Sequence, residues 1–376
     1  VRSLDFGPDG ITVATCGNNR GDLWNWTTGE HLRQLYGHTS WVQDIRFSPD
    51  GALLLTGSSD NTVRLWDWQT GSVLQTITYP APVSSPTAFS PDGERILVPA
   101  GDIAYVHNVN TGLELAAFAY NGYQWSCGAW SPDGTEIFLG PHGSGVVVQF
   151  DVSDPSAPLQ VFSTGQPSSI SSLDVTPDGQ SFLCGGWLSS SARLVDITTG
   201  NEIRAFGPHA EYAQGRLSSN GLYYATGDGT GVSRIWDVSS GSLLEQYNGQ
   251  GDNVAIPAMS PDCTLILTGG IDHYVRVWET GLSACPTPTP EPEWQRVTDM
   301  PTTRELAGIA VHDERIFVVG GITKANTYIP TVERYDPSIH TWETSISDLP
   351  QPRFGVACAV LGDRLHAMGG SNSAGS

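Results

Sequence analysis

A short turn, Phe-Ser-Pro-Asp-Gly or a close variant of it, recurs along most of this chain at a nearly constant spacing. Its acidic or amide residues are separated by 41, 42, 41, 45, 42 and 42 residues, and an apolar residue stands three places before each of them. This repetition indicates one small structural unit copied seven times, and units of this kind bury their faces by stacking on one another. The acidic or amide positions are Asp9, Asp50, Asp92, Asp133, Asp178, Asn220 and Asp262.

Each repeat is predicted to be a small antiparallel sheet. In the second copy, residues 41–47 alternate between apolar and polar side chains, which is the period of a half-buried strand. Residues 48–51, Ser-Pro-Asp-Gly, form a tight turn, because proline presets φ and glycine accepts conformations that side chains disfavour. Further strands are expected over residues 52–56, 62–66 and 73–77. Four antiparallel strands in about 42 residues match one blade of a β-propeller.

A second sequence feature, a pair of adjacent residues, recurs at the end of each predicted third strand. Together with Gly37-His38 at the start of the second copy, it resembles the WD40 repeat family over about residues 1–283. The resemblance implies an all-β fold in which seven blades form a closed ring. The pairs are Trp24-Asn25, Trp66-Asp67, His107-Asn108, Phe150-Asp151, Val195-Asp196, Trp236-Asp237 and Trp278-Glu279.

The resemblance also implies a buried, hydrogen-bonded network inside the second blade. Its members are His38, Thr56, Asp60 and Trp66. In this position His38 is a structural residue rather than a general base. Blades three, four and five lack the tryptophan, so we expect the ring to depend mainly on apolar packing.

The composition changes after the last WD40-like repeat. Residues 284–293 are a Pro/Thr-rich linker. Over residues 294–376 the period becomes 49, since Gly320-Gly321 returns as Gly369-Gly370. This double glycine, followed by a spaced Tyr335 and Trp342, resembles the kelch repeat. We therefore expect a truncated kelch-type propeller with one full blade and part of a second.

Both ends of the chain are expected to be cuts in a longer protein. Val1 begins directly at the innermost strand of the first blade, and no clear fourth strand follows Gly281 in the seventh. A segment upstream of Val1 would be the element that completes the seventh blade.

Charge and apolar content exclude several functions. The net charge is −21 at pH 7 with a single lysine, Lys324, and no basic stripe, so nucleic-acid binding is disfavoured. No uninterrupted apolar run of about 18 residues predicts a membrane span.

The Thr-Pro linker and the scarcity of lysine favour an extracytoplasmic location. Cys263 and Cys285 belong to the same repeat and either pair or stay reduced.

No catalytic residue, cofactor site or metal site is predicted. The sequence has no Gly-x-Ser-x-Gly elbow, His-Glu-x-x-His helix, phosphate-binding glycine loop or calcium loop in the required context. The aspartates of the repeated turns are explained by hydrogen bonds to their own backbone.

These observations favour a non-catalytic protein-interaction scaffold. In WD40 proteins the loops before the innermost strands and the turns between strands two and three emerge on one face, which is the usual binding surface. The resemblance therefore implies a partner on this face, and the acidic charge favours a basic protein or peptide. The residues expected on it are Trp41, Tyr123, Trp125, His142, Trp187, Tyr212, Asp228 and His273.

Two alternatives stay open from the sequence. The chain could be the non-catalytic part of a secreted enzyme whose remainder completes a kelch domain similar to galactose oxidase, although residues 294–376 show no copper-ligand set. An aromatic rim could instead stack sugars in a carbohydrate-binding module. The sequence does not identify the partner or the oligomeric state.

Overall fold

The computed structural model describes residues 1–83, 85–248, 257–270 and 274–282 of the N-terminal part. In the C-terminal part it describes residues 307–312, 315–320, 322–323, 327–336, 341–349, 351–352, 357–361 and 364–368. The chain divides into two compact units, Val1–Pro290 and Glu291–Ser376, and each is described by itself. The boundaries expected at residues 283 and 293 stay predictions.

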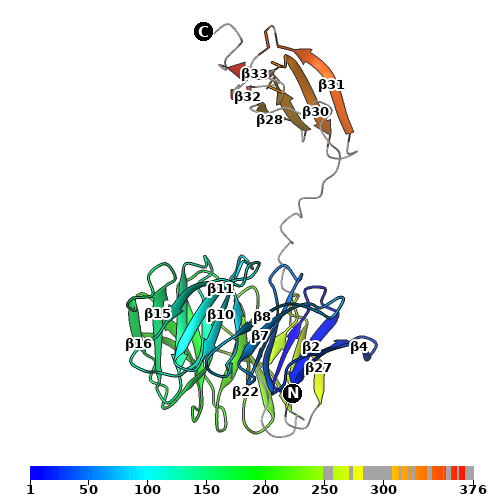
Figure 1. The fold of residues 1–376 in the computed structure, drawn as a ribbon. Helices are drawn as coiled ribbons and strands as arrows, with labels where there is room; N and C mark the ends of the chain where they lie inside the picture. The colour runs from blue at the N-terminus through cyan, green and yellow to red at the C-terminus, as the bar shows by residue number, and fades with distance from the viewer. Residues whose placement is uncertain are drawn as a thin grey trace. The chain divides into compact units, whose positions relative to one another are not determined.

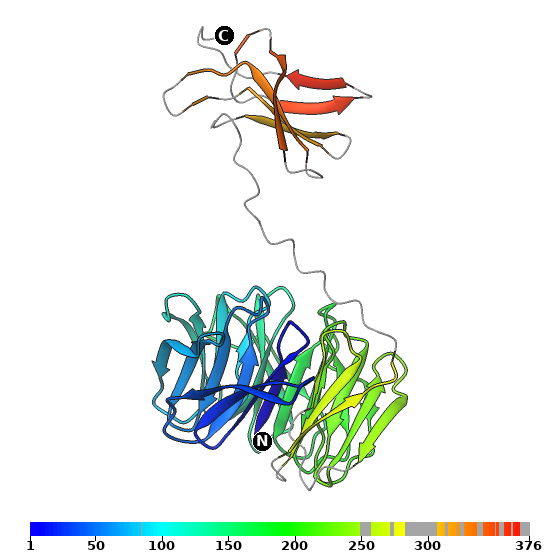
Figure 2. The same cartoon turned by 90° about the vertical axis from the view of Figure 1, so that its right-hand side faces the viewer.

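The described part of the first unit contains seven antiparallel sheets, six with four strands and one with three. Figures 1 and 2 show these sheets side by side around the unit. In every sheet the strands are paired in chain order, with the first strand innermost. The first strands are β1 (Ser3–Phe6), β5 (Val42–Phe47), β9 (Ala88–Phe89), β13 (Trp125–Trp130), β17 (Ile170–Val175), β21 (Gln214–Leu217) and β25 (Ala258–Met259).

The remaining strands follow the same order in each sheet. The second strands are β2 (Thr12–Gly17), β6 (Leu54–Ser58), β10 (Arg95–Ala100), β14 (Glu136–Pro141), β18 (Ser181–Gly186), β22 (Tyr223–Gly227) and β26 (Leu265–Gly269). The third strands are β3 (Arg20–Asn25), β7 (Thr62–Asp67), β11 (Ile103–Asn108), β15 (Val146–Asp151), β19 (Ala192–Asp196), β23 (Val232–Asp237) and β27 (Val275–Glu279). The fourth strands are β4 (Glu30–Tyr36), β8 (Ser72–Thr78), β12 (Glu114–Phe118), β16 (Gln160–Ser163), β20 (Glu202–Phe206) and β24 (Leu243–Asn248).

The apolar core shows that the ring is closed. Among the described residues of this unit there are seven clusters of buried side chains, and each joins two consecutive sheets. One of them joins the last sheet to the first, because Leu4 and Val13 pack with Ala258 and Leu267. The predicted seven-bladed propeller is therefore confirmed.

The recurring turn is built by side chains that bond the backbone of the same turn. In the second sheet, Asp50 Oδ1 accepts the amide of Ala52 at 3.0 Å, and Ser48 Oγ accepts the amide of Leu53 at 2.9 Å. Gly51 has φ of 71°, a left-handed conformation that favours glycine. In the seventh turn Cys263 takes this position with φ of 60°.

The cysteines differ in state. Cys16, Cys127, Cys184 and Cys358 are free. The first three are buried, and burial raises the pKa of each of these thiols. Cys263 is disulfide-bonded. The sequence left open whether it pairs with Cys285, and Cys285 lies outside the described residues.

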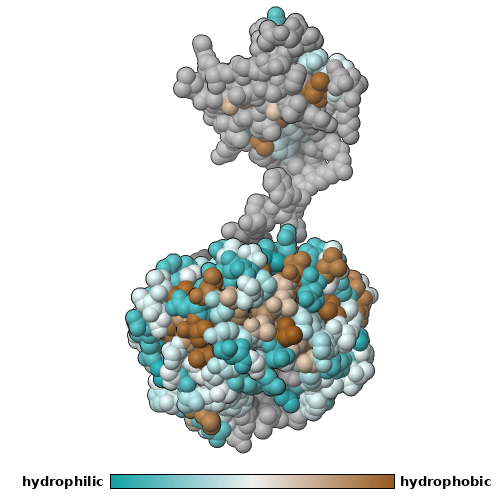
Figure 3. Space-filling view, turned by 60° about the vertical axis from the view of Figure 1, so that its left-hand side comes forward, coloured by the Kyte–Doolittle hydropathy of each residue, from teal (hydrophilic) through white to brown (hydrophobic). Residues whose placement is uncertain are grey.

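Apolar side chains recur on the outer wall of the ring, as the brown patches of Figure 3 show. They lie in the fourth strands or just before them, in six successive sheets. This recurrence indicates a property of the repeat unit and not one specific site. The exposed side chains are Leu32, Val73, Leu74, Leu113, Leu115, Leu159, Val161, Ile203, Leu243 and Leu244.

Carboxylates on the first strands connect neighbouring sheets. Asp5 accepts the amide of Phe47 at 3.0 Å, and Asp174 accepts the amide of Leu217 at 2.8 Å. Asp5 also pairs with Arg216 across the ring at 3.0 Å. These bonds tie the first strands of separate sheets to one another.

The carboxyl groups of Asp5 and Asp174 both have raised pKa values. Asp174 and Arg216 line a cavity of about 330 Å³ between the first strands of sheets two to six. Burial raises the pKa of Asp5 and of Asp174 to about 6, although Arg46 lowers both values in part. Because the folded pKa lies above the unfolded value of 3.8, ionisation of these two groups lowers stability as the pH rises from about 4 to about 6.

The variant Asp174→Asn is expected to remove part of this pH dependence. An amide cannot ionise, and its oxygen can still accept the amide hydrogen of Leu217. Relative to the wild type, the variant should gain about 1–3 kcal/mol of unfolding free energy between pH 4 and pH 7, as measured by urea denaturation. Asp178→Asn is the control, because hydrogen bonds lower the pKa of that turn carboxyl and it should show no such gain above pH 5. If the difference in unfolding free energy between the wild type and Asp174→Asn does not change with pH, the raised pKa of Asp174 is contradicted.

The second unit contains two sheets in its described part. One has four strands, β28 (Gly308–His312), β29 (Arg315–Val319), β30 (Thr331–Asp336) and β31 (Thr341–Asp348), and the other pairs β32 (Ala357–Leu361) with β33 (Arg364–Met368). The rings of Tyr335 and Trp342, which the sequence singled out, lie 5.1 Å apart on β30 and β31. The expectation of one full kelch-type blade and part of a second is confirmed.

Candidate partner-binding face

Two sets of connections emerge from the same end of the sheets, because successive strands are antiparallel. We call this end the loop face. It comprises the loops before the first strands and the turns between the second and third strands, and the opposite end, which carries the Ser-Pro-Asp-Gly turns, is the turn face. The described loops are 37–41, 79–83, 85–87, 119–124, 164–169 and 207–213, and the described turns are 18–19, 59–61, 101–102, 142–145, 187–191 and 228–231.

The structure exposes some of the eight residues expected on the loop face and buries others. Trp41 and Trp187 are exposed, by 47% and 44%, and His142 is exposed as well. Tyr123 is half-buried, with its ring against Trp125. His273 lies outside the described residues.

The expectation that Trp125 and Tyr212 are open to a partner is wrong. Trp125 is 1% exposed, because it packs against Phe150 and its Nε1 donates to the carbonyl of Phe118. Tyr212 is 3% exposed beneath the ring of Trp187. Both side chains are covered by groups that are distant in sequence.

Asp228 is also misplaced by the sequence analysis. Its side chain is fully buried, accepts the amide of Thr230 at 3.0 Å and pairs with Arg234 at 2.7 Å. It closes the turn between β22 and β23, so it is not available on the surface.

The network expected in the second sheet is joined by hydrogen bonds. His38 Nδ1 lies 2.9 Å from Asp60 Oδ2, and His38 Nε2 lies 2.8 Å from Thr56 Oγ1. Trp66 Nε1 donates to the same hydroxyl at 2.8 Å. Hydrogen bonds from Thr62, Thr39 and His38 outweigh burial and lower the pKa of Asp60 to about 2. Both ring nitrogens of His38 are therefore engaged, and the structure uses this histidine to hold strands together.

The sixth sheet contains a similar arrangement. His209 Nε2 and Trp236 Nε1 both lie 2.8 Å from Thr226 Oγ1. Burial lowers the pKa of His209 to about 4, so its ring is neutral at pH 7. His209 is thus a buried structural residue.

Trp41 is partly covered by a cation of this chain. The guanidinium carbon of Arg2 lies 4.9 Å from the centre of the Trp41 ring. This is within the range of a cation–π contact. Sequence reasoning missed Arg2, because no pattern links it to a residue of the next blade.

Trp187 is held in place by the neighbouring sheet. Its amide donates to Ser169 at 3.1 Å, and it forms a β-bridge with Tyr212, whose ring centre lies 5.0 Å from its own. The preceding Gly185 permits this approach, because a Cβ there would lie 2.2 Å from the carbonyl oxygen of Ala213. The exposed indole is therefore attached to a rigid support.

Two further residues beside Trp187 were missed by the sequence analysis. Leu188 is 75% exposed with φ of 58°, and Glu211 is exposed with φ of 68°. A left-handed conformation is costly for residues other than glycine and is enriched at functional sites. A sequence offers no reliable signal for such conformations outside glycine and asparagine.

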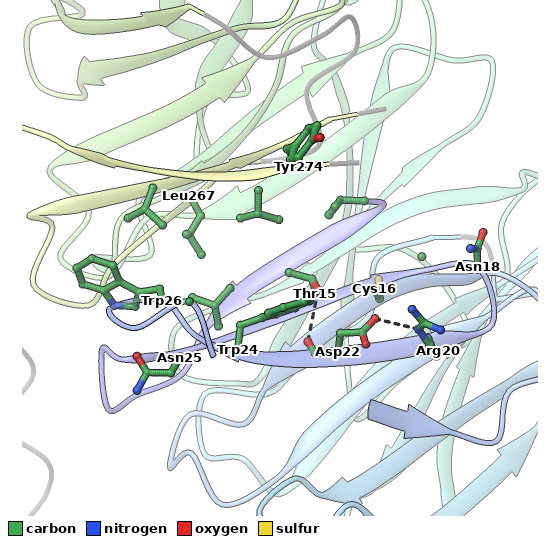
Figure 4. Close-up of a pocket in the computed structure, with 16 residues that line it drawn as sticks. Thr15, Cys16, Asn18, Arg20, Asp22, Trp24, Asn25, Trp26, Leu267 and Tyr274 are labelled. Atoms are coloured by element: carbon green, nitrogen blue, oxygen red, sulfur yellow. Dashed lines mark hydrogen bonds and ion pairs between the residues drawn. The ribbon is translucent and has the colours of Figure 1, made fainter. Parts of the chain in front are cut away.

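A separate cavity of about 490 Å³ lies between the seventh and first sheets (Figure 4). One wall carries Val275 and Val277 of β27, which are half-buried. Val63 and Leu65, at the same positions of β7, are buried. Since sheet seven has three strands in its described part, this cavity runs beside the edge where the other sheets have a fourth strand. The upstream segment expected to complete this sheet stays a prediction.

The opposite wall of the cavity is aromatic and polar. Figure 4 shows Trp24 and Asp22 on β3, with Trp26 just beyond the strand. Asp22 pairs with Arg20 at 3.1 Å and contacts His31 at 2.9 Å. Aromatic rings beside carboxylate and guanidinium groups could hold a polar ligand.

Neither a metal cluster nor a spanning helix occurs in the described part of the chain. No group of three or more His, Cys, Asp or Glu side chains among these residues could hold a metal ion. The same residues form no helix long and apolar enough to cross a membrane.

Comparisons with known proteins agree with the repeats. The family model "WD domain, G-beta repeat" matches residues 29–67 and 241–279, and the model "Kelch motif" matches residues 303–344. The guanine nucleotide-binding protein subunit beta of Arabidopsis thaliana is 22% identical over 306 residues, 75% of this chain and 81% of that protein.

Two further matches are shorter. Beta-scruin of Limulus polyphemus is 37% identical over 78 residues, 21% of this chain, and alpha-scruin of the same organism is 29% identical over 112 residues, 29% of this chain. The aligned part spans only 8% and 12% of the length of these two proteins. The chain therefore carries WD40 repeats that form a β-propeller, followed by a kelch motif.

Proposed function

We propose that this chain is a non-catalytic interaction scaffold that binds a basic protein segment on its loop face. The observation that carries the proposal is the exposure of two fixed tryptophans, Trp41 and Trp187, on one end of a rigid ring. Large aromatic side chains on a rigid support contribute strongly to protein interfaces, because little entropy is lost on binding. The repeats are of the same kind as those of the subunit beta relative, which supports a role in protein interaction.

The charge of the chain supports a basic partner. A net charge of −21 attracts cationic segments and speeds their encounter. Asp102 and Glu211 are exposed acidic residues on the loop face.

The location of the binding site on the loop face is tested with two double variants that change the net charge of the chain equally. Asp102→Lys with Glu211→Lys alters the loop face, whereas Glu30→Lys with Glu94→Lys alters exposed residues at the opposite end of the strands. Binding of fluorescent hexa-arginine to the full chain is measured by anisotropy. We expect the loop-face variant to weaken binding by about tenfold and the control by less than about threefold, since close charges act more strongly than screened ones. Equal weakening by both variants would contradict a loop-face site.

The cavity between sheets seven and one favours a second candidate function, carbohydrate binding. Trp24 and Trp26 could stack on a sugar ring, and Asp22 could accept its hydroxyl hydrogens. A glycan array probed with the full chain tests this candidate. If the chain binds a glycan, Trp24→Ala abolishes this binding and hexa-arginine does not bind, carbohydrate binding is favoured over the scaffold function.

A further inference from the structure

Trp187 differs from Trp41, which is also exposed, in having no cation over its ring among the described residues. Arginine guanidinium groups lie 4.9 Å from the ring centres of Trp41 and Trp130 and 6.0 Å from that of Trp66. Within the described ranges, no lysine or arginine lies over Trp187, although 44% of this side chain is exposed. The ring therefore offers a face of the kind that this chain fills elsewhere with its own arginines.

The position of the Trp187 ring is fixed before any partner arrives. Tyr212 supports one side of it at 5.0 Å, and the β-bridge between the two residues fixes the backbone. A partner group that stacks on the other side would not have to order the indole first. Preorganised contacts of this kind lose less free energy on binding.

A carboxylate and an aliphatic side chain accompany the ring. Glu211 immediately precedes Tyr212 and is exposed, and no basic side chain among the described residues pairs with it. Leu188 immediately follows Trp187 and is 75% exposed. An aromatic face, an aliphatic side chain and a carboxylate match the three parts of an arginine side chain, namely its planar cation, its methylene stem and its hydrogen-bond donors.

We propose that Trp187, Leu188 and Glu211 form a receptor for one arginine side chain of the partner. The guanidinium stacks on the indole of Trp187, the stem lies against Leu188, and Glu211 accepts hydrogen bonds from the guanidinium. Lysine fits less well, because its compact ammonium is strongly hydrated and cannot stack as a plane. This inference rests on the proposed function, since it assigns the anchor of the same loop face.

The test compares three probes, hexa-arginine, hexa-lysine and uncharged hexa-citrulline, by isothermal titration calorimetry on the full chain. We expect hexa-arginine to bind more tightly than hexa-lysine, and hexa-citrulline not to bind. Trp187→Ala should weaken hexa-arginine binding by about five- to tenfold and remove the preference for arginine over lysine, as expected for a partly desolvated cation–π contact. Leu115→Ala is the control and should change the affinity by less than about twofold, because this exposed side chain lies on the outer strand β12 and not on the loop face.

Two further variants separate binding from folding. Trp187→Leu keeps apolar cover over Tyr212 but has no aromatic face, so it should lose affinity as Trp187→Ala does. Glu211→Gln should weaken hexa-arginine binding by about two- to threefold and reduce its dependence on salt. If Trp187→Leu binds hexa-arginine as tightly as the wild type and still prefers it to hexa-lysine, the arginine receptor is overturned.

The outcomes also distinguish this inference from the proposed function. If the loop-face charge variant loses binding while both Trp187 variants bind as the wild type does, the scaffold proposal stands and the receptor is wrong. Absence of any hexa-arginine binding would overturn both.

Discussion

Thr56→Val is expected to lower the free energy of unfolding by about 3 kcal/mol. Valine keeps the shape of threonine but removes the hydroxyl that joins Trp66 and His38. Because Asp60 accepts from His38 Nδ1, the other ring nitrogen is the acceptor of the Thr56 hydroxyl hydrogen. The substitution thus leaves two buried polar groups without partners, at a cost of about 1–3 kcal/mol each. Chemical denaturation at pH 7 measures the difference.

Thr15→Val in the first sheet is the matched control. Trp24 Nε1 donates to Thr15 Oγ1 at 3.2 Å, but Trp24 is only half-buried and water can replace the lost partner. We expect a cost below about 1 kcal/mol. A Thr56→Val cost as small as that of Thr15→Val would show that the buried network does not stabilise the second blade.

Asp44→Ala is expected to cost about 3–5 kcal/mol. The Asp44 carboxylate is buried and accepts hydrogen bonds from Ser3 Oγ at 2.7 Å, from Arg46 Nε at 3.1 Å and from the Thr87 amide at 2.9 Å. Ser3 and Arg46 belong to the first and second sheets, and Thr87 lies in the loop just before the third sheet. Removing the carboxylate leaves a largely buried guanidinium and a buried amide without their acceptor, which is costly in a low-dielectric environment.

Asp67→Ala is the control for this second prediction. Asp67 closes an exposed turn by accepting the amide of Thr70 at 3.0 Å, so its loss should cost less than about 1 kcal/mol. Thermal and urea unfolding of both variants at pH 7 provide the comparison. If Asp44→Ala loses less than about 1 kcal/mol, the carboxylate is not a tie between the sheets.

The repeat architecture could be predicted because its signals are local. The turn residues and the strand alternation are properties of single repeats, and in the second copy the strand expected over residues 62–66 is observed at Thr62–Asp67. The second strand is displaced by two residues, from 52–56 to Leu54–Ser58, because Ala52 and Leu53 still belong to the hydrogen-bonded turn.

The exposure of the loop-face residues could not be predicted as well. Whether Trp125 or Tyr212 is open depends on which side chains of other segments cover it, and the repeat pattern does not contain this information. Asp228 was expected on the loop face because it lies in a predicted turn between the second and third strands. A turn residue can still be buried, and the repeat pattern does not show that Arg234 and the amide of Thr230 engage its carboxylate.

Hydrogen–deuterium exchange of the full chain, with and without hexa-arginine, shows which face of the ring binds the peptide. We expect slower exchange in residues 187–191 and 207–213 of the loop face when the peptide is bound. We expect no change in the turn-face segments 48–51 and 218–222. Protection confined to the turn face, or spread evenly around the ring, would contradict a partner-binding loop face.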